Sequence, residues 1–456
     1  MPGCTDFERT RWSRRKLLTA GVGGFGALAL PQILRADEVA RKTKAKHLIF
    51  LHQFGGPSHI DTFDLKPNAP DNVRGEFKGI RTSVPGIQVC EHLPRWAKVM
   101  HHWAQFRAVY HRMSNHNPAT YYSLTGRAPP LDDIRLRDTL DLQPTYCSVV
   151  AKFRPSDDPA IPSFVSFPHL LRDGSVTPGQ HASYLGKAFD PFFVQSDPNS
   201  PNFTLPELSL PADVPLERLQ ERRKLLEAFD RHARLAETSE AARGVERFSE
   251  RAMAMLASTK VRDAFDLSKE KPQLRDQYGR TTFGQSCLLA RRLIEAGVRA
   301  TTVYFSDSIG GPKNGGWDTH NDNFNALKDR LLPITDHVVP TLIEDLHSRG
   351  LLAETLVVWM GEFGRAPKIG DRDAKGRTHW PHCYTVMMAG GGLKGGAIWG
   401  ASDRRGAYPA ENATKLEDIA ATMFWALGID PGSEVRDAVG RPVPLAYGKP
   451  VTQVFG

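Results

Sequence analysis

The sequence lacks several features that each identify a class of protein. Its five cysteines include no Cys-x-x-Cys pair, which excludes a zinc ribbon and a dense disulfide framework. We expect most of these thiols to be buried, and one long-range disulfide stays an open alternative. No Gly-rich fingerprint joins a first strand to a helix with an acidic residue about 20 positions later, so a dinucleotide-binding enzyme is disfavoured. No internal repeat is present either.

Neither a long apolar run nor a large excess of one charge is present. The 456 residues are 40% hydrophobic and 24% charged, a balance typical of a folded soluble protein. Lys and Arg exceed Asp and Glu by 59 − 51 = 8, but residues 1–36 hold six basic and two acidic side chains, so the remaining excess is 53 − 49 = 4. That excess is spread along the chain, and we therefore expect no nucleic-acid partner.

Paired arginines near the N-terminus precede a mildly apolar, Gly-rich run. Arg14 and Arg15 stand before residues 17–30, a run that is too short to cross a hydrocarbon core of about 30 Å. The pattern resembles a twin-arginine export signal that is cleaved near Ala36. It predicts a signal peptide over residues 1–36 and a mature domain over residues 44–456. The protein would then be exported and periplasmic, with no stable membrane anchor after signal cleavage. An uncleaved amphipathic tail is the alternative.

Apolar runs and helical stretches alternate along the rest of the chain, which is the rhythm of an α/β fold. Strands are expected over residues 46–51, 106–110, 161–167, 300–305, 355–360 and 384–388. Helices are expected over residues 285–296, 323–349 and 415–427, the second with a break near Pro333 or Pro340. Further helices over residues 214–275 would form a cap or a lateral layer. The polar, Pro-rich stretches 132–159 and 174–211 predict excursions over the surface.

Metal-binding types of side chain follow three of the expected strands. In open α/β sheets, ligands bind beyond the carboxyl ends of the strands. The three segments carry, in chain order, His52, His59 and Asp61, then Asp318 and His320, then Glu362, Arg365, His379 and His382. Carboxylates and imidazoles from separate segments suit zinc or manganese, and a bound divalent ion favours hydrolysis of a phosphate or sulfate ester. Arg365 is predicted to hold a tetrahedral anion through its bidentate guanidinium.

Each of these residues also has a purely structural explanation. A single histidine is more often a capping or surface residue than a ligand. Asp61 can cap a turn before Lys66, and Glu362 can be a solvated loop acid.

A fourth polar segment, residues 111–127, reads HRMSNHNPATYYSLTGR. It predicts a turn from a strand into a helix whose first N–H groups suit an anion. Ser114, His116 and Thr120 are the nucleophile candidates in it. An ordinary helix capped by Asn115 or Asn117 explains the same segment equally well.

Five sequence blocks connect the chain to a known family. They are GGPSHIDTFDLKP, NHNPATYYSLTG, GWDTHNDNF, VVWMGEFGRAPKI with GRTHWPH, and MMAGGGLKGGAIWG. In this order they resemble the bacterial exported family known as domain of unknown function 1501, which is placed in the alkaline phosphatase-like and sulfatase superfamily. The resemblance covers nearly the whole mature chain. It implies an α/β fold in which a central, mostly parallel sheet is sandwiched by helices, as one large domain with insertions. The family brings no established reaction with it.

The wider superfamily is similar only in part. Its hydrolases usually place acidic metal ligands at the end of the first strand, where this chain has His52 and Gln53. A Ser, Thr or modified Cys nucleophile normally occupies the position of His116, so the modified-cysteine mechanism is excluded.

The remaining superfamily ligands are better matched. Asp318 and His320 resemble its Asp and His ligands, and His379 or His382 resembles its final His. The usual Asp-His pair after the late strand is represented by Glu362 followed by a phenylalanine, so the carboxylate is kept and the imidazole is lost.

Two functions from different classes follow from these observations. The first is an exported metal-dependent hydrolase of a phosphate or sulfate ester, on a small molecule or a glycan, with His116 as nucleophile or general acid. Its zinc, manganese or calcium ion would be bound by Asp318, His320, Glu362 and His379, with His382 and Asp61 as further candidates. The second is a non-catalytic exported binding or assembly protein on the same fold, suggested by the missing first-strand acids and hydroxyl nucleophile.

Overall fold

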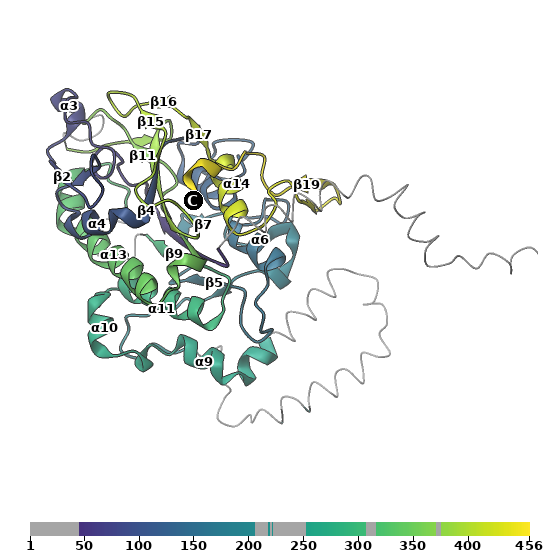
Figure 1. Cartoon of the computed structure of the whole chain (residues 1–456). Helices are drawn as coiled ribbons and strands as arrows, with labels where there is room; N and C mark the ends of the chain where they lie inside the picture. Colours follow the sequence, from purple (N-terminus) through teal and green to yellow (C-terminus); the bar gives the residue numbers. More distant parts are fainter. Residues whose placement is uncertain (1–44, 206–217, 219–220, 222–251, 307–315, 371–374) are drawn as a thin grey trace, which may run out of the picture.

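One large sheet forms the centre of the protein (Figure 1). The computed structural model describes residues 45–205, 218, 221, 252–306, 316–370 and 375–456. The nine strands run in the order β14, β4, β13, β10, β1, β9, β5, β8, with β17 beside β4. Their bounds are β1 His47–Gln53, β4 Trp103–Tyr110, β5 Phe164–Phe167, β8 Phe192–Phe193, β9 Ala300–Phe305, β10 Thr355–Met360, β13 Tyr384–Gly390, β14 Ile398–Trp399 and β17 Thr414–Lys415.

Strand β1 lies in the middle of this sheet and pairs in parallel with both β9 and β10. Strand β13 pairs antiparallel with both β10 and β4, while every other pairing within this sheet is parallel. The expected mostly parallel sheet is therefore confirmed, with β13 as the reversed strand.

Both faces of the sheet are covered, which explains why its strands read as continuous apolar runs. In β1, Ile49 and Leu51 belong to one buried apolar cluster, whereas Leu48 and Phe50 belong to the other. The first cluster includes helices α4 (Pro94–Val99), α11 (Thr282–Ala296) and α13 (Leu332–Ser348), and the second includes α5 (His116–Thr125), α6 (Tyr146–Phe153) and α14 (Leu416–Ala426). The sheet is thus sandwiched by helices, as expected.

Smaller elements decorate this sandwich. The short helices are α3 (Asp71–Arg74), α9 (Thr259–Phe265), α10 (Pro272–Gln277) and α12 (Asn323–Ala326). The two-stranded hairpins pair β2 (Gly79–Arg81) with β3 (Gln88–Cys90), β6 (Arg172–Asp173) with β7 (Ser175–Val176), β11 (Gly364–Arg365) with β12 (His379–Trp380), β15 (Ala401–Ser402) with β16 (Pro409–Glu411), and β18 (Glu434–Arg436) with β19 (Pro442–Pro444).

All six expected strands are present, and two other expectations need correction. Residues 132–159 are not simply a surface excursion, because they include α6, in which Cys147, Val149 and Val150 are buried. Eight residues are too few to display sustained helical periodicity in the sequence. The helix expected over residues 323–349 continues through Pro340, whereas a π-helical turn at Leu327–Leu331 precedes Pro333 in the first turn of α13.

Other expectations fall only partly on the described residues. Cys90, Cys147, Cys287 and Cys383 are free and buried, which confirms the expected buried thiols. Of the helices expected over residues 214–275, α9 packs beside α11, while much of the rest lies outside the described residues. The signal peptide expected over residues 1–36 lies entirely outside them. In the part of the chain that the structure describes, no helix has the length and apolar character needed to cross a membrane.

Candidate metal centre

The polar segments meet at one edge of the sheet because of the strand directions. Strands β4, β9 and β10 all end at this edge, and the reversed strand β13 begins there. His116 starts the helix that follows β4, Asp318 follows β9, Glu362 follows β10, and His379 precedes β13. Three parts of the chain that are far apart in the sequence, around His116, around Asp318 and between β10 and β13, therefore supply side chains to one place.

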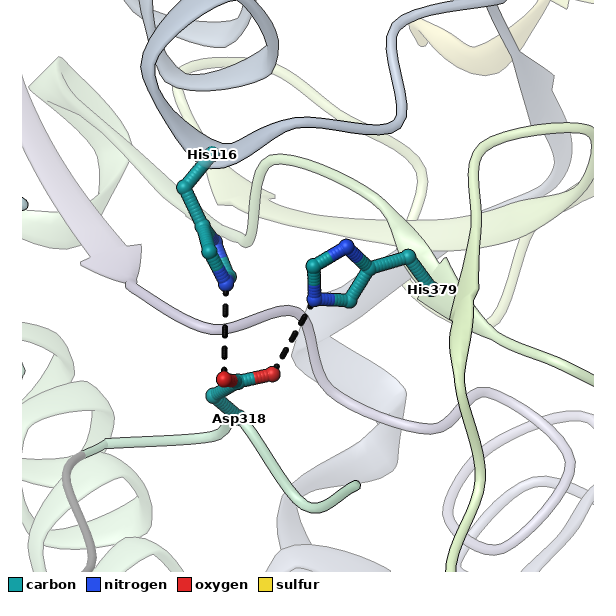
Figure 2. Close-up of side chains that lie close together, drawn as sticks. All are labelled: His116, Asp318 and His379. Carbon is teal, nitrogen blue, oxygen red and sulfur yellow. Dashed lines mark hydrogen bonds and ion pairs between the residues drawn. The ribbon is translucent and has the colours of Figure 1, made fainter. Parts of the chain in front are cut away.

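Asp318 lies at the centre of this group (Figure 2). Its Oδ1 atom is 3.1 Å from Nε2 of His379 and 3.1 Å from Nε2 of His320, and its Oδ2 atom is 3.5 Å from Nε2 of His116. Ligand-type atoms of His116, Asp318 and His379 all lie within 4.8 Å of one another. Burial alone raises the pKa of Asp318, but its contacts with the three histidines and the positive charge of Arg365 hold it well below its usual value. Asp318 is thus a carboxylate at neutral pH.

His379 presents an unprotonated nitrogen to this carboxylate. Its Nδ1 atom donates to the main-chain oxygen of Ser114 at 2.6 Å, so in the neutral ring Nε2 carries the lone pair. Burial lowers the pKa of His379 to about 4, which keeps the ring neutral. That Nε2 atom lies only 2.7 Å from Nε2 of His320. The facing atoms of His379, His320 and Asp318 therefore share at most one proton, which Nε2 of His320 would carry.

Glu362 does not contact Asp318 directly. His116 lies between the two carboxylates and contacts both. The Oε1 atom of Glu362 accepts from Nδ1 of His116 at 2.7 Å and from the main-chain N–H of Gly55 at 2.8 Å, and the Glu362 side chain is completely buried. A side chain at Gly55 would collide with the main chain of Asp318, so only glycine fits this approach. The Oε2 atom of Glu362 is buried without a hydrogen-bond partner among the described residues.

His116 is held between two carboxylates. Burial lowers the pKa of His116, but hydrogen bonds with Asp318 and Glu362 outweigh this and raise it to about 9. Burial likewise raises the pKa of Glu362, and the bond to His116 lowers it below the usual value. At neutral pH both ring nitrogens of His116 are therefore protonated.

Arg365 is placed to orient Asp318. Its Nη2 atom is 2.5 Å from Oδ1 of Asp318, and its remaining hydrogen bonds go to main-chain oxygens of Gly55, Gly56, Trp317 and Arg377. The side chain is completely buried. In this arrangement the guanidinium has no face directed at solvent, so the predicted anion-binding role has no geometric support.

Two of the predicted ligands lie elsewhere. Asp61 is buried in an ion pair with Arg377 at 2.7 Å and accepts from Ser58 and Asn323. His382 lies against the rings of Trp380 and Tyr408, with ring centroids 4.9 and 5.8 Å away. The structure does not bring either side chain to Asp318.

One supporting residue was missed by the sequence analysis. Asp132 accepts hydrogen bonds from the main-chain N–H groups of Ser114 and Asn115 and from both of their side chains. Asp132 thereby holds Ser114, whose main-chain oxygen accepts from His379. It also holds Asn115, which directly precedes His116. Nothing in the Pro-rich sequence around Asp132 distinguishes it from a surface loop acid. Asn115 does occupy the N-cap position before His116, but its side chain contacts Asp132 and caps no helical N–H group.

A hollow of about 590 Å³ opens beside the cluster. It is lined by Asp318 and His320 and by residues of α12. This space is large enough for a small ester or one end of a larger one.

The sequence profile of a family described as protein of unknown function (DUF1501) matches residues 45–455. The chain belongs to the DUF1501 family. No curated protein matches this DUF1501 chain in sequence.

Several solved structures are similar to the DUF1501 chain. A sulfatase, PsFucS1, from Pseudoalteromonas sp. is 10% identical over 87% of this chain and 72% of its own, with a TM-score of 0.41. The lipoteichoic acid synthase LtaP from Listeria monocytogenes is 11% identical over 91% and 92%, with a TM-score of 0.39. The phosphonate monoester hydrolase SpPMH from Silicibacter pomeroyi is 13% identical over 90% and 76%, with a TM-score of 0.35. Similarity at this level does not establish a shared reaction.

Proposed function

We propose that this DUF1501 protein is an exported, metal-dependent hydrolase of a phosphate or sulfate ester. The observation that carries the proposal is the convergence of His320, His379 and Asp318. Their three mutual contacts are of hydrogen-bond length, but at most one proton is available to them. Export is supported by the paired Arg14 and Arg15 before a short apolar run.

The donor set fits a divalent cation. In the metal-free protein, a proton on Nε2 of His320 can be shared by His379 and Asp318, but Nδ1 of His320 is then left buried without a partner among the described residues. A cation bonded by Oδ1 of Asp318 and by Nε2 of His320 and His379 would take the place of the single shared proton and pair all three of these atoms, while the proton of His320 would move to its Nδ1 atom. Two imidazoles and one carboxylate are a common set for a catalytic zinc or manganese ion, which keeps a further position open. Such an ion would polarise an ester oxygen and acidify a bound water.

The surrounding residues would then have distinct roles. His116, protonated on both nitrogens, is suited to donate a proton to a leaving group and is not suited to act as a nucleophile. Glu362 would hold His116 in place through Nδ1, and Arg365 would fix the orientation of Asp318. The hollow beside Asp318 and His320 would receive the ester.

A second candidate function is a non-catalytic exported binding or assembly protein. It is favoured by the state of His116, which occupies the nucleophile position of the wider superfamily as an imidazolium between two carboxylates. The two functions differ in whether bound metal leads to turnover.

The test is metal content followed by activity. The purified protein should contain stoichiometric zinc, manganese or calcium by mass spectrometry, and the metal-loaded protein should hydrolyse at least one ester in a panel of 4-nitrophenyl phosphates and sulfates. Asp318→Asn should weaken calorimetric metal affinity at least about 100-fold and abolish turnover, since even loss of an outer-shell partner costs 10- to 100-fold.

His382→Ala is the matched control, because His382 lies outside the cluster and should leave both metal affinity and turnover unchanged. Absence of a stoichiometric metal, or equal metal affinity in wild type and Asp318→Asn, would contradict the metal site. Tight metal binding without turnover of any ester would favour the binding protein.

A further inference from the structure

A groove runs along the β2–β3 hairpin, away from the metal centre. It consists of two adjoining hollows of about 670 and about 450 Å³, both lined by Leu65, Pro67 and Gln88. The two hollows adjoin at these shared residues, and together we call them the basic groove.

Cationic side chains dominate its walls. They are Lys66, Arg74, Lys78, Arg81 and Arg107, against the single carboxylate of Glu76. Nearby acids neutralise part of this charge: Asp64 contacts Lys66 at 3.0 Å and Arg107 at 3.9 Å, and Asp71 contacts Arg74 at 2.6 Å.

A further acid, Glu91, lies beside the groove, where its Oε1 atom accepts from the main-chain N–H of Lys78 at 2.9 Å. Lys78 and Arg81 are the two wall cations outside the ion pairs named above. Both side chains are exposed, and neither forms an ion pair within the part of the chain that the structure describes. They lie at the start of the hairpin, where the two hollows meet around β2. A local excess of positive charge in a concave surface attracts anionic ligands.

Apart from Thr82 and Gln88, the rest of the wall is apolar, and it contains no exposed aromatic ring. Leu65, Pro67, Val84 and Pro85 provide apolar surface, whereas Phe63 and Phe77 are 1% and 9% exposed. Single-stranded nucleic acids are bound by stacking their bases on exposed rings, so this groove lacks what they need. Aliphatic faces between cations fit the C–H faces and anionic substituents of a charged sugar chain.

We propose that the basic groove binds an anionic polysaccharide, with Lys78 and Arg81 contacting its sulfate or carboxylate groups. Helix α12 separates the groove from the metal centre: its Phe324 ring lies 5.4 Å from that of Phe77, while Asn325 and Ala326 line the hollow beside Asp318. The binding needs neither a metal ion nor turnover, so it stands independently of the proposed hydrolase activity.

The test uses the full chain in the presence of a chelator, which removes any contribution from bound metal. Dextran sulfate and uncharged dextran of the same length are titrated into it at 50 and 200 mM NaCl, and binding is followed by calorimetry. Dextran sulfate should bind, more tightly at the lower salt concentration because salt screens exposed charges, and uncharged dextran should not. The double variant Lys78→Glu with Arg81→Glu should bind dextran sulfate at least tenfold more weakly.

The charge-matched control is Lys260→Glu with Lys271→Glu, on and beside α9 and α10, which lie far from β2 in Figure 1. It should keep wild-type affinity, and all variants should show the wild-type thermal unfolding curve. Equal loss of affinity in both double variants, or no loss in the groove variant, would overturn the proposal. Tighter binding of polyglutamate than of dextran sulfate would also overturn it, in favour of an acidic peptide.

Discussion

His111 joins two segments of the candidate metal centre through both of its ring nitrogens. Nε2 donates to the main-chain oxygen of Glu362 at 2.6 Å, and Nδ1 accepts from the N–H of Met113 at 3.0 Å. Burial lowers the pKa of His111 to about 4, since the charged ring would lose its hydration in the interior. The neutral ring is therefore part of the folded state.

This predicts a loss of stability in mild acid. An unfolded histidine has a pKa of about 6.5, so between pH 6.5 and 4 the unfolded chain binds more protons than the folded one, and the free energy of unfolding falls as pH is lowered. His111 alone can account for at most about 3 kcal/mol of this fall. Urea unfolding of wild type and His111→Gln at pH 7, 5.5 and 4.5 measures it. In the variant, the free energy of unfolding should fall less steeply between pH 7 and pH 4.5 than in wild type. An unchanged pH dependence would show that His111 is not responsible.

Asp132 gives a second prediction at the residue scale. Asp132→Ala removes the acceptor of four hydrogen bonds and leaves N–H groups of Ser114 and Asn115 unpaired, which should lower the free energy of unfolding by about 1–3 kcal/mol. Metal affinity should also fall, because Ser114 orients His379. Asp133→Ala is the control, since Asp133 pairs only with nearby Arg135 in the described structure. Equal metal affinity in the two variants would contradict the role of Asp132.

The sequence predicted part of this site for an identifiable reason. Asp318, His320, Glu362 and His379 belong to segments next to strand ends, and the packing of parallel strands brings such segments together. The same rule selected Asp61 and His382, which lie near the same strands but point to other partners. Side-chain direction within a loop is not encoded in the spacing, so this distinction could not be made from the sequence.

At the scale of elements, burial on both faces made the strands easy to recognise and α6 hard to recognise. The strands appear as apolar runs because they face two cores, whereas α6 has only eight residues between Pro-rich segments. The reversed direction of β13 could not be predicted either, since its apolar run resembles those of the parallel strands.

The packing of α6 leads to a test of its own. Val150 is fully buried in α6, and Val150→Ala should lower the free energy of unfolding by about 2 kcal/mol through lost apolar contact and a small cavity. Leu140→Ala removes a larger side chain from the same stretch, but Leu140 is 67% exposed, so the change should stay within about 0.5 kcal/mol. Chemical unfolding of both variants measures the difference. Equal effects would mean that α6 is not packed in the core.

At the scale of the whole molecule, the export hypothesis makes a prediction about location. Replacing Arg14 and Arg15 by lysine should keep the full-length chain in the cytoplasm of a bacterial host, because the paired arginines are the recognised feature of the signal. Immunoblots of periplasmic and cytoplasmic fractions measure the outcome. Replacing Arg9 and Arg11 by lysine is the matched control and should leave export unchanged. Periplasmic protein from both variants in equal amounts would contradict twin-arginine export.

The direction of β13 places three residues of the candidate site on one connection. Because β10 ends and β13 begins at the same edge of the sheet, Glu362, Arg365 and His379 all belong to the chain between Met360 and Tyr384. Within this connection, β11 and β12 pair Arg365 with His379, so the two residues that contact Oδ1 of Asp318 from this side are held next to each other by main-chain pairing. A substitution that breaks this two-stranded pairing would therefore displace both contacts of Asp318 at once.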